Sequence, residues 1–429
     1  MEKLMQYVWQ YRLWLPADMA TVDGTRVDVL DPGLLNTDAG PDFFNAKIRI
    51  GDKLWAGNVE IHVRASDWYR HGHHNDRAYD TVVLHVVERD DARIKRSDGE
   101  EIPQIVMPCA ANFSETYHRM VDDRTVDLPC ARIIASMPHI YITDWVSALG
   151  FERLYAKSDR VLDAVRRAGG DWQQAIYVTL ARALGFGTNS DPFERVALAT
   201  PLRTLMRHRD DRVTVEGALF GQAGFLDNIP DNADPYLKRL RQDYEFTAAK
   251  YGYVRPLSPG WKMSRMRPQN FPHRRIAALA AMVSGGFGIG SKIFTVRTLE
   301  DARALFDFEL NAFWQRRYSF EAEAPHPIKT LSKSSVNSLI INVVAPVLHA
   351  YGIATGHTGL STTAVDILHA VEAENNVFVR MFTSAGIDCP DAFTSQALVQ
   401  LRRNYCESRK CLYCRIGHRY LACHAIRRS

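Results

Sequence analysis

Two consecutive stretches of alternating polar and apolar residues constrain the N-terminal part of this chain most strongly. Apolar residues fall at every second position over residues 43–50, and the alternation resumes over residues 54–64 after a turn at Gly51 and Asp52. Successive side chains of a strand point to opposite faces of a sheet, so this period of two predicts two strands joined as a hairpin. The first strand is expected to bury Phe44 and every second residue after it.

The predicted hairpin places acidic residues close to one another. Asp42 stands at the start of the first strand, and Glu60, His62 and Arg64 share one face of the second. Two neighbouring carboxylates repel each other unless a cation neutralises them, so Asp42 and Glu60 predict a site for Mg²⁺ or Mn²⁺. His62 is then placed to orient water or contact a phosphate, and Arg64 to bind a phosphate backbone. The alternative is a polar hairpin face with solvent-exposed charges.

The order Pro41-Asp42 followed by Glu60-Ile61-His62 resembles the core of the PD-(D/E)XK nucleases. The resemblance implies a restriction-endonuclease-like fold in which Asp42 and Glu60 bind the metal ion. It also implies that the third residue orients the attacking water and stabilises charge. That family usually has lysine there, and a histidine stabilises negative charge only when it is protonated. A protein that binds nucleic acid without cleaving it, or serves as a scaffold, is therefore the main alternative.

Histidines are dense directly after the second predicted strand. His71, His73 and His74 follow His62 closely, and His85 lies in the next predicted strand, over residues 81–88. Histidine is a common zinc ligand, so three of these histidines could form a zinc site with an open coordination position. A zinc hydrolase is therefore the third functional hypothesis, and a surface loop that contacts nucleic acid is the alternative.

From about residue 136 the apolar period changes to 3.6, which predicts helices. We therefore expect an α+β protein of three parts, because 429 residues exceed one ordinary domain. The parts are a β-rich α/β domain over residues 1–115, an all-helical domain over 116–385 and a basic, cysteine-rich tail over 386–429. The predicted helices include residues 171–184, 191–200, 234–251, 274–283, 298–314, 334–351 and 364–384, with Asp171 and Asp191 as N-caps.

Basic residues cluster in the predicted loop 261–275. Its arginines surround Phe271, and they are Arg265, Arg267, Arg274 and Arg275. Arginines beside an aromatic ring can hold a phosphate backbone and stack a base, so the loop predicts nucleic acid, with DNA as the first choice. The same arginines could instead pair with acidic residues of the first domain.

The C-terminal segment carries a second metal-binding pattern. Cys406, Cys411 and Cys414 have the spacing C-x4-C-x2-C, which predicts either a structural Zn²⁺ site or an iron–sulfur cluster of the kind held by plant-type ferredoxins. The candidates for the fourth ligand are His418, Cys423 and, as an outside candidate, Cys389. Reduced thiols without a metal are the alternative.

Composition predicts a soluble cytoplasmic protein. The formal net charge is only +4, and the seven cysteines come without a recognisable secretory signal, which favours a reducing compartment. No apolar run reaches the length of a membrane span, because Asn342, Pro346 and His349 interrupt the best candidate, residues 338–355. No membrane association is expected, and the sequence does not predict the oligomeric state.

Several motifs resemble an uncharacterised bacterial family, a domain of unknown function that is common in Bacteroidetes. The motifs are GPDFFNAKI, GNVEIH, SDWYRHGHH, YDTVVLHVV, LFGQAGFLD, RPQNFP and YCESRKCLYCRIG. The resemblance covers nearly the full length and implies no established activity. Some PD-(D/E)XK nucleases carry an iron–sulfur cluster held by C-terminal cysteines, and this chain is similar to them at the level of the fold.

Overall fold

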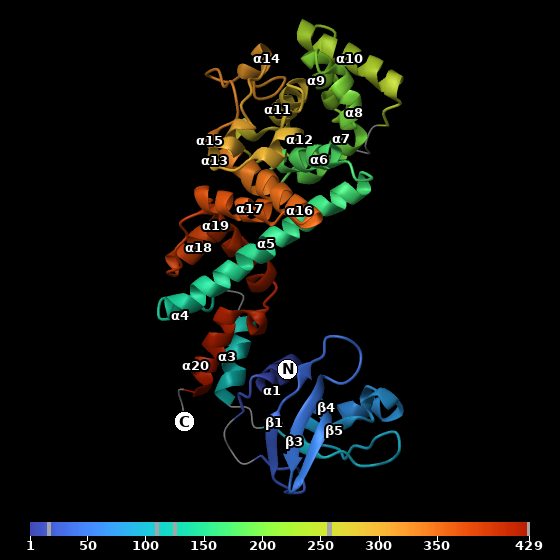
Figure 1. Cartoon of the computed structure of the whole chain (residues 1–429), viewed down its shortest axis with the longest axis vertical. Coiled ribbons are helices and arrows are strands. Elements are labelled where there is room, and N and C mark those ends of the chain that lie inside the picture. The colour runs from blue at the N-terminus through green and yellow to red at the C-terminus, as the bar shows by residue number, and fades with distance from the viewer. Residues whose placement is uncertain (15–18, 108–110, 123–126, 255–259, 427–429) are drawn as a thin grey trace. The chain divides into compact units, whose positions relative to one another are not determined.

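The computed structural model describes residues 1–14, 19–107, 111–122, 127–254 and 260–426 and confirms the α+β class (Figure 1). The chain forms two compact units rather than three consecutive ones. The first unit is Met1–Trp145, Ala385–Ile387 and Arg402–Ser429, and the second is Val146–Ser384 and Asp388–Leu401. The cysteine-rich C-terminal residues therefore belong to the same unit as the N-terminal sheet.

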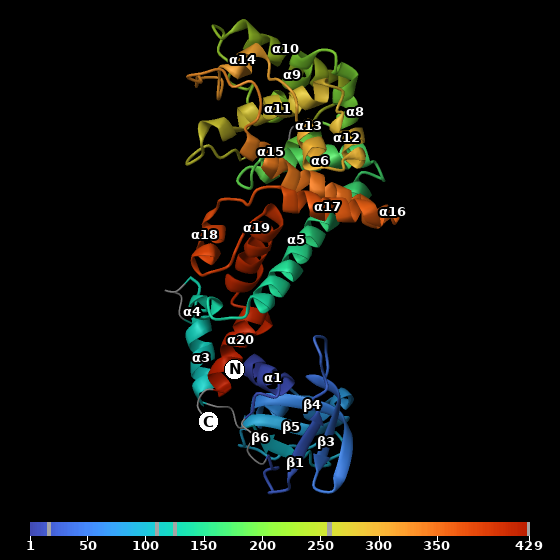
Figure 2. The same ribbon diagram turned by 60° about the vertical axis from the view of Figure 1, so that its left-hand side comes forward.

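The first unit contains a mixed sheet of six strands (Figure 2). The strands are β1 (Val27–Asp31), β2 (Leu34–Leu35), β3 (Phe43–Ile50), β4 (Lys53–Arg64), β5 (Val82–Arg89) and β6 (Gln104–Val106). The order is β1-β3-β4-β5-β6, and β2 pairs with β3. The pairs β1/β3, β2/β3 and β3/β4 are antiparallel, whereas β4/β5 and β5/β6 are parallel. The two predicted strands at residues 43–64 are therefore an antiparallel hairpin, as expected.

A β-bulge at Asn45 changes which side chains of β3 are buried. The register pairs Phe43 with Val59 and Ala46 with Gly57, so it shifts between these two positions. Asn45 has φ +56°, and its N–H donates to the Asn58 side-chain oxygen at 3.2 Å. The strict alternation that placed Phe44 in the core was wrong, because the extra residue of the bulge turns Phe43 inward instead.

Helix α1 (Glu2–Gln10) packs on the sheet and shares its hydrophobic core. Leu4 and Val8 of α1 lie in one buried cluster with Ile61 of β4 and with Leu412 and Leu421 near the C-terminus. Each fully buried aliphatic side chain contributes about 1.5–3 kcal/mol of transfer free energy. The two ends of the chain therefore stabilise one common core.

Further short helices belong to the first unit. They are α2 (Asp67–Arg70), the 3₁₀ turns η1 (His73–Asn75) and η2 (Arg77–Tyr79), α3 (Ala111–Asp122) and α4 (Ala131–Ile134). The C-terminal elements of the first unit follow a π-helical stretch, η7 (Leu401–Cys406), and they are η8 (Cys411–Tyr413) and α20 (Arg415–Ile426). Helix α5 (His139–Arg167) begins in the first unit and continues into the second.

The second unit is helical and has its own buried core. Its further elements are α6 (Trp172–Leu184), α7 (Ser190–Ala199), α8 (Leu202–Leu205), η3 (Met206–His208), α9 (Arg212–Gln222), α10 (Pro235–Tyr251), η4 (Pro268–Asn270), α11 (Pro272–Ser284), α12 (Ile289–Lys292), η5 (Ile293–Thr295), α13 (Leu299–Ala304), α14 (Ala312–Gln315), α15 (Lys333–Leu339), η6 (Ile340–Val344), α16 (Ala345–Thr355), α17 (Thr358–Ala370), α18 (Val377–Ser384) and α19 (Ala392–Gln400). Asp171 caps α6 as predicted, whereas Asn189 rather than Asp191 is the N-cap residue of α7.

Three predicted helices of this unit are interrupted. Residues 298–314 form α13 and α14, and residues 364–384 fall in α17 and α18, with irregular chain between the members of each pair. The run Lys333–Thr355 widens to a π-helix over Ile340–Val344, because Pro346 has no N–H to donate to the carbonyl of Asn342. By length and composition this run could cross a membrane, but 67% of its apolar window is buried inside the unit.

The bulge gives a testable prediction for stability. Replacing Asn45 with valine should destabilise the first unit by about 1–2 kcal/mol, because a β-branched residue is strained at φ +56°. Asn45→Gly serves as the control and should change stability little, since glycine adopts this conformation readily. Urea unfolding followed by tryptophan fluorescence would measure both, and equal losses for the two variants would contradict a strained backbone.

Candidate functional site

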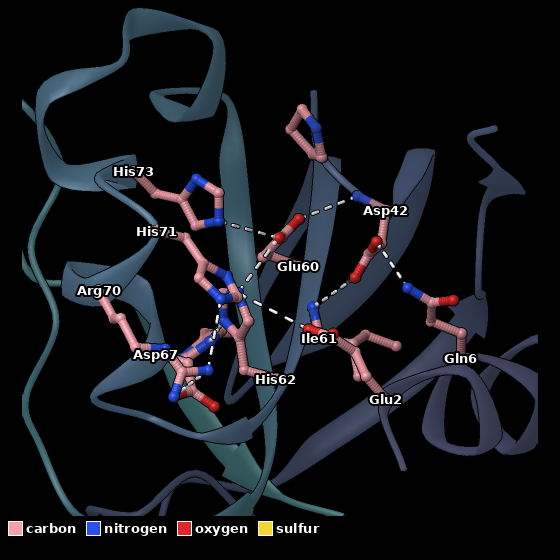
Figure 3. A network of polar contacts seen from close by, with 12 residues as sticks. Glu2, Gln6, Asp42, Glu60, Ile61, His62, Asp67, Arg70, His71 and His73 are labelled. Carbon is pink, nitrogen blue, oxygen red and sulfur yellow. Dashed lines mark hydrogen bonds and ion pairs between the residues drawn. The ribbon is translucent and has the colours of Figure 1, made fainter. Parts of the chain in front are cut away.

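Asp42 and Glu60 meet where the hairpin brings the start of β3 beside β4 (Figure 3). The backbone N–H of Asp42 donates to Oε2 of Glu60 at 2.9 Å, and the N–H of Ile61 donates to Oδ2 of Asp42 at 3.0 Å. Gln6 of α1 donates to Oδ1 of Asp42 at 2.8 Å. Each carboxyl group therefore accepts a hydrogen bond from the backbone of the other's segment, and the Asp42 carboxyl group accepts one more from α1.

Three histidines lie together at this place, and two of them face the carboxyl group of Glu60. His62 Nε2 lies 3.5 Å from Glu60 Oε1, and His73 Nε2 lies 3.4 Å from the same oxygen. His71 Nδ1 lies 3.2 Å from His62 Nε2, and one ligand nitrogen from each of the three histidines falls within 4.8 Å of the others. The carboxylate site and the histidine site that the sequence offered as alternatives are therefore one site (Figure 3).

The turn after α2 places His71 and His73 in this site. Gly72 between them has φ +80°, a conformation that reverses the chain locally and favours glycine. The His73 ring stacks on Tyr79 with centroids 3.8 Å apart, and Trp68 is fully buried beneath the turn. His74 is not one of the three grouped histidines, and its Nε2 is hydrogen-bonded to the side chain of Asn75.

A chain of hydrogen bonds fixes the proton positions on His62. The Gln104 amide nitrogen donates to Asp90 at 2.6 Å, which turns the Gln104 oxygen toward His85 Nδ1 at 2.8 Å. His85 Nδ1 therefore carries the proton, and its Nε2 accepts from His62 Nδ1 at 2.8 Å. The remaining nitrogen of His62, Nε2, keeps its lone pair and points toward Glu60. This is how a histidine is oriented to bind a metal ion.

Burial sets the charge state of the site. Burial and the neighbouring histidines lower the pKa of His62 to about 2, and burial lowers the pKa of His73 to about 4. Burial, followed by the charge of Asp42, raises the pKa of Glu60, and burial also raises the pKa of Asp42. The imidazoles of His62 and His73 are therefore neutral at pH 7, while the carboxyl group of Glu60 favours its protonated form until a cation approaches.

The donor set fits a divalent transition metal. Glu60 and His62 are 5% and 1% exposed, and His73 Nε2 is buried without a hydrogen-bond partner in the described part of the chain. Two or three imidazoles with a carboxylate form the usual donor set of catalytic zinc sites, and imidazole suits transition metals better than Mg²⁺. Glu2 of α1, whose Oε1 lies 3.9 Å from His62 Nε2, adds a half-buried carboxyl group at the edge.

The arginines predicted to bind nucleic acid divide into two groups. Arg64 at the end of β4 and Arg265 and Arg267 in the second unit are exposed. Arg274 and Arg275 are 4% and 2% exposed, so the structure corrects the expectation that these two contact nucleic acid. They begin a helix that is buried on all sides, and their guanidinium groups are used inside the second unit.

The two buried arginines have structural partners instead. Arg274 donates to the carbonyl oxygens of Trp314 at 2.7 Å, Arg317 at 3.2 Å and Ile328 at 2.9 Å. Arg275 donates to Ser335 Oγ at 2.9 Å, and its guanidinium lies 4.3 Å from the centre of the Phe186 ring. Both guanidinium groups therefore fasten segments of the helical core to α11.

The residues predicted for the C-terminal metal centre lie in different surroundings. Cys406, Cys411 and Cys414 are free thiols that are buried or half-buried in the first unit. His418 Nδ1 is hydrogen-bonded to the Tyr7 hydroxyl, and its ring packs on Tyr11. Cys389 belongs to the second unit, and the side chain of Cys423 lies outside the described residues.

The shifted pKa values predict a pH dependence for the metal-free protein. The pKa of Glu60 is higher in the folded protein than in the unfolded chain. Its contribution to the free energy of unfolding is therefore fully present below the unfolded pKa and is lost as the pH rises through the folded pKa. The lowered pKa values of His62 and His73 act in the opposite sense, since their contribution is lost as the pH falls below about 6.5. Glu60→Gln should therefore gain stability relative to the parent between pH 5 and 9.

Denaturant unfolding in the presence of a chelator measures this difference. Glu88→Gln, a change of another acid on the sheet, is the matched control and should follow the parent at every pH. Curves for Glu60→Gln and the parent that stay parallel over this range would contradict a buried, protonated Glu60.

The buried arginines give a second stability prediction. Arg274→Met should destabilise the second unit by about 3 kcal/mol or more, because it leaves buried carbonyl oxygens without donors. Arg267→Met changes an exposed side chain and should alter stability by less than about 0.5 kcal/mol. Thermal unfolding of the two variants checks this contrast, and a stable Arg274→Met protein would show that these hydrogen bonds are dispensable.

Comparison with known proteins places the chain by sequence family. Neither the curated proteins nor the solved structures include a match to it. One family model, described as "Protein of unknown function (DUF2851)", matches residues 2–377, which contain the whole sheet, the histidine turn and most of the helical unit. This confirms the expected membership of an uncharacterised family. The chain belongs to the DUF2851 family of proteins of unknown function.

Proposed function

We propose that this protein is a metal-dependent hydrolase that cleaves phosphodiester bonds in nucleic acid, with DNA as the first candidate substrate. The observation that carries the proposal is the cluster of His62, His71 and His73, in which His62 and His73 face the carboxyl group of Glu60. Asp42, which also meets Glu60, supplies the second carboxyl group of the original nuclease hypothesis. Such a site serves hydrolysis because all its members can bind a cation or move a proton.

Each residue has a distinct role in this proposal. Glu60, His62 and His73 hold the cation, and Asp42 fixes the Glu60 carboxyl group through its backbone N–H. A bound divalent cation lowers the pKa of water and neutralises negative charge on a phosphate. His71 is exposed at the edge of the site, where it can contact the substrate and exchange a proton with it. The imidazoles favour Mn²⁺ or Zn²⁺, whereas the carboxylates alone would also accept Mg²⁺.

Exposed arginines support a polyanionic substrate. Arg64 follows Glu60 and His62 on the same strand, and Arg265 and Arg267 offer further exposed guanidinium groups in the second unit. Asn189 ties the segment just before Arg267, because its amide donates to the Lys262 carbonyl at 2.8 Å and accepts from the Lys262 N–H at 2.9 Å. The five described cysteines are free thiols, which supports a reducing compartment, and we place the protein in the cytoplasm.

A binding protein without catalytic activity is the second candidate. The observation that favours it is the low pKa of His62, which burial holds at about 2. A neutral imidazole cannot supply the positive charge that a lysine supplies at this position. The metal ion alone would then have to neutralise the charge of the phosphate. The same residues would bind nucleic acid without cleaving it.

A cleavage assay separates the two candidates. Purified protein is incubated with single- and double-stranded DNA and RNA in the presence of Mg²⁺, Mn²⁺ or Zn²⁺. We expect cleavage that a chelator abolishes, and a loss of about 100-fold or more in Glu60→Gln and His73→Ala. Asp52→Asn, a change of an exposed acid in the β3–β4 turn, is the control and should keep the parent rate.

Each other outcome decides against part of the proposal. Nucleic-acid binding without cleavage under all three cations would establish the binding protein instead. Cleavage that persists in both Glu60→Gln and His73→Ala would show that the catalytic site lies elsewhere. Activity with Mg²⁺ alone, unaffected by His73→Ala, would remove the histidines from the metal site.

A further inference from the structure

A guanidinium group stands at the edge of the histidine cluster (Figure 3). Arg70, the last residue of α2, has its Nη2 atom 3.4 Å from Nε2 of His71, and His71 Nδ1 in turn lies 3.2 Å from His62 Nε2. The Arg70 side chain is 69% exposed, and His71 is exposed as well. Arg70 therefore lies at the side of the proposed cation site that is open to solvent.

A buried carboxylate holds Arg70 in this position. Asp67 Oδ1 lies 3.0 Å from Arg70 Nη2, and Asp67 is only 6% exposed. Its other oxygen, Oδ2, accepts a hydrogen bond from the N–H of Arg64 at 3.2 Å, which fixes the orientation of the carboxylate. An ion pair with a buried and oriented acid restrains its arginine more than a pair of mobile surface side chains does.

The short helix that carries Arg70 is itself fastened to the rest of the unit. Ser66, directly before α2, donates through its N–H and its hydroxyl group to the two carboxylate oxygens of Asp91, both at 2.8 Å. The Trp68 ring is fully buried, and its Nε1 donates to the Lys95 carbonyl oxygen at 3.0 Å. Recognition of a ligand requires groups that are held on rigid elements, and α2 meets this condition.

The directions of the hydrogen bonds connect Arg70 to the metal-facing nitrogen of His62. A guanidinium group only donates hydrogen bonds, so His71 Nε2 accepts and His71 Nδ1 carries the proton. His71 Nδ1 therefore donates to His62 Nε2, which is the nitrogen that the hydrogen bond to His85 leaves with a lone pair. When His62 Nε2 binds a cation, His71 can no longer donate to it, and the N–H of His71 becomes available to a substrate beside Arg70.

The charge of the site calls for a fixed positive group. Carboxyl groups surround the histidine cluster, and they belong to Glu2, Asp42, Glu60 and Asp67. His62 and His73 add no positive charge at pH 7, because burial lowers their pKa values. A divalent ion offsets the charge of the carboxylates that it binds, so a phosphate group needs further positive charge to be held there.

Arg70 has the donors that this task requires. Within the described ranges of the chain, the side-chain contacts of Arg70 use Nη2 alone, so the N–H groups of Nη1 and Nε remain available. Guanidinium N–H groups match the oxygen atoms of a phosphate in charge and geometry. A neutral ester or amide would gain little from the same group.

We propose that Arg70, held by Asp67, binds a phosphate oxygen of the substrate beside the cation site and acts there together with His71. The proposal rests on the proposed hydrolase function and deepens it, because it names the group that recognises the phosphate. It also favours a phosphodiester over a carboxylic ester or an amide as the substrate of this site.

A binding measurement tests the proposal without requiring cleavage. The full-length protein is loaded with Mn²⁺, and its affinity for a short single-stranded DNA oligonucleotide with cleavage-resistant phosphorothioate linkages is measured by fluorescence anisotropy. Arg70→Ala should weaken oligonucleotide binding by about 10-fold or more and leave the affinity for Mn²⁺ unchanged, because it removes a charged donor to phosphate but no metal ligand. Arg70→Lys should restore part of the loss, since it keeps the positive charge.

Arg77→Ala is the matched control, because Arg77 is an exposed arginine of the same unit whose charge acts on Asp80. It should bind the oligonucleotide as the parent does. Parent affinity in Arg70→Ala, or an equal loss in Arg77→Ala, would overturn the proposal. A parent protein that binds the oligonucleotide but cleaves no substrate would contradict the hydrolase function, while the comparison of Arg70→Ala with Arg77→Ala would still decide the role of Arg70.

A second variant covers the case in which Arg70→Ala fails to fold because the buried Asp67 loses its partner. Asp67→Asn combined with Arg70→Ala removes the buried negative charge together with the guanidinium group. We expect this double variant to fold and to lose oligonucleotide affinity as described for Arg70→Ala. Parent affinity in the folded double variant would overturn the proposal.

Discussion

The burial of one carboxyl group, that of Glu60, determines how the first unit must be built. The side chain is 5% exposed, and a carboxylate in such surroundings is costly unless a cation or several hydrogen bonds compensate its charge. Its Oε2 accepts one backbone hydrogen bond, from Asp42, and its Oε1 faces two imidazole nitrogens beyond hydrogen-bonding geometry. A metal ion at this place would satisfy both the carboxylate and the buried nitrogen of His73.

The surrounding structure positions the groups that face Glu60. The bulge at Asn45 lets β3 deliver Asp42 to β4 while Phe43 enters the core. Gly72 turns the chain so that His71 and His73 lie on one side. The hydrogen bonds from Asp90 through Gln104 to His85 fix which nitrogen of His62 keeps its lone pair. His85 lies on β5, and Gln104 lies on β6. Outer hydrogen bonds of this kind tune a metal site as strongly as the ligands do.

The sequence predicted the hairpin almost to the residue, because a period of two has a single structural solution when one face is buried. It therefore also predicted the meeting of Asp42 with Glu60. It could not show that the histidine turn joins the same site, because this depends on a left-handed Gly72 and on the packing of α2. Gly72 between two histidines was the available signal.

Contacts between distant segments and the burial of charged side chains could not be predicted from the sequence. The C-terminal segment returns to the unit of the N-terminal sheet, which no local pattern announces. Arg274 and Arg275 were predicted to be exposed because charged side chains usually are. The residues that follow them, IAALAAMV, are however apolar on every face of the helix. A helix without a polar face is buried, and that pattern was the signal for two internal arginines.

The most direct test of the account is the anomalous diffraction of crystals soaked with Mn²⁺ or with Zn²⁺. The account predicts a peak between Glu60 Oε1, His62 Nε2 and His73 Nε2, with the ion within bonding distance of all three atoms. The absence of a peak there, with His71 still hydrogen-bonded to His62 in the soaked crystal, would contradict it.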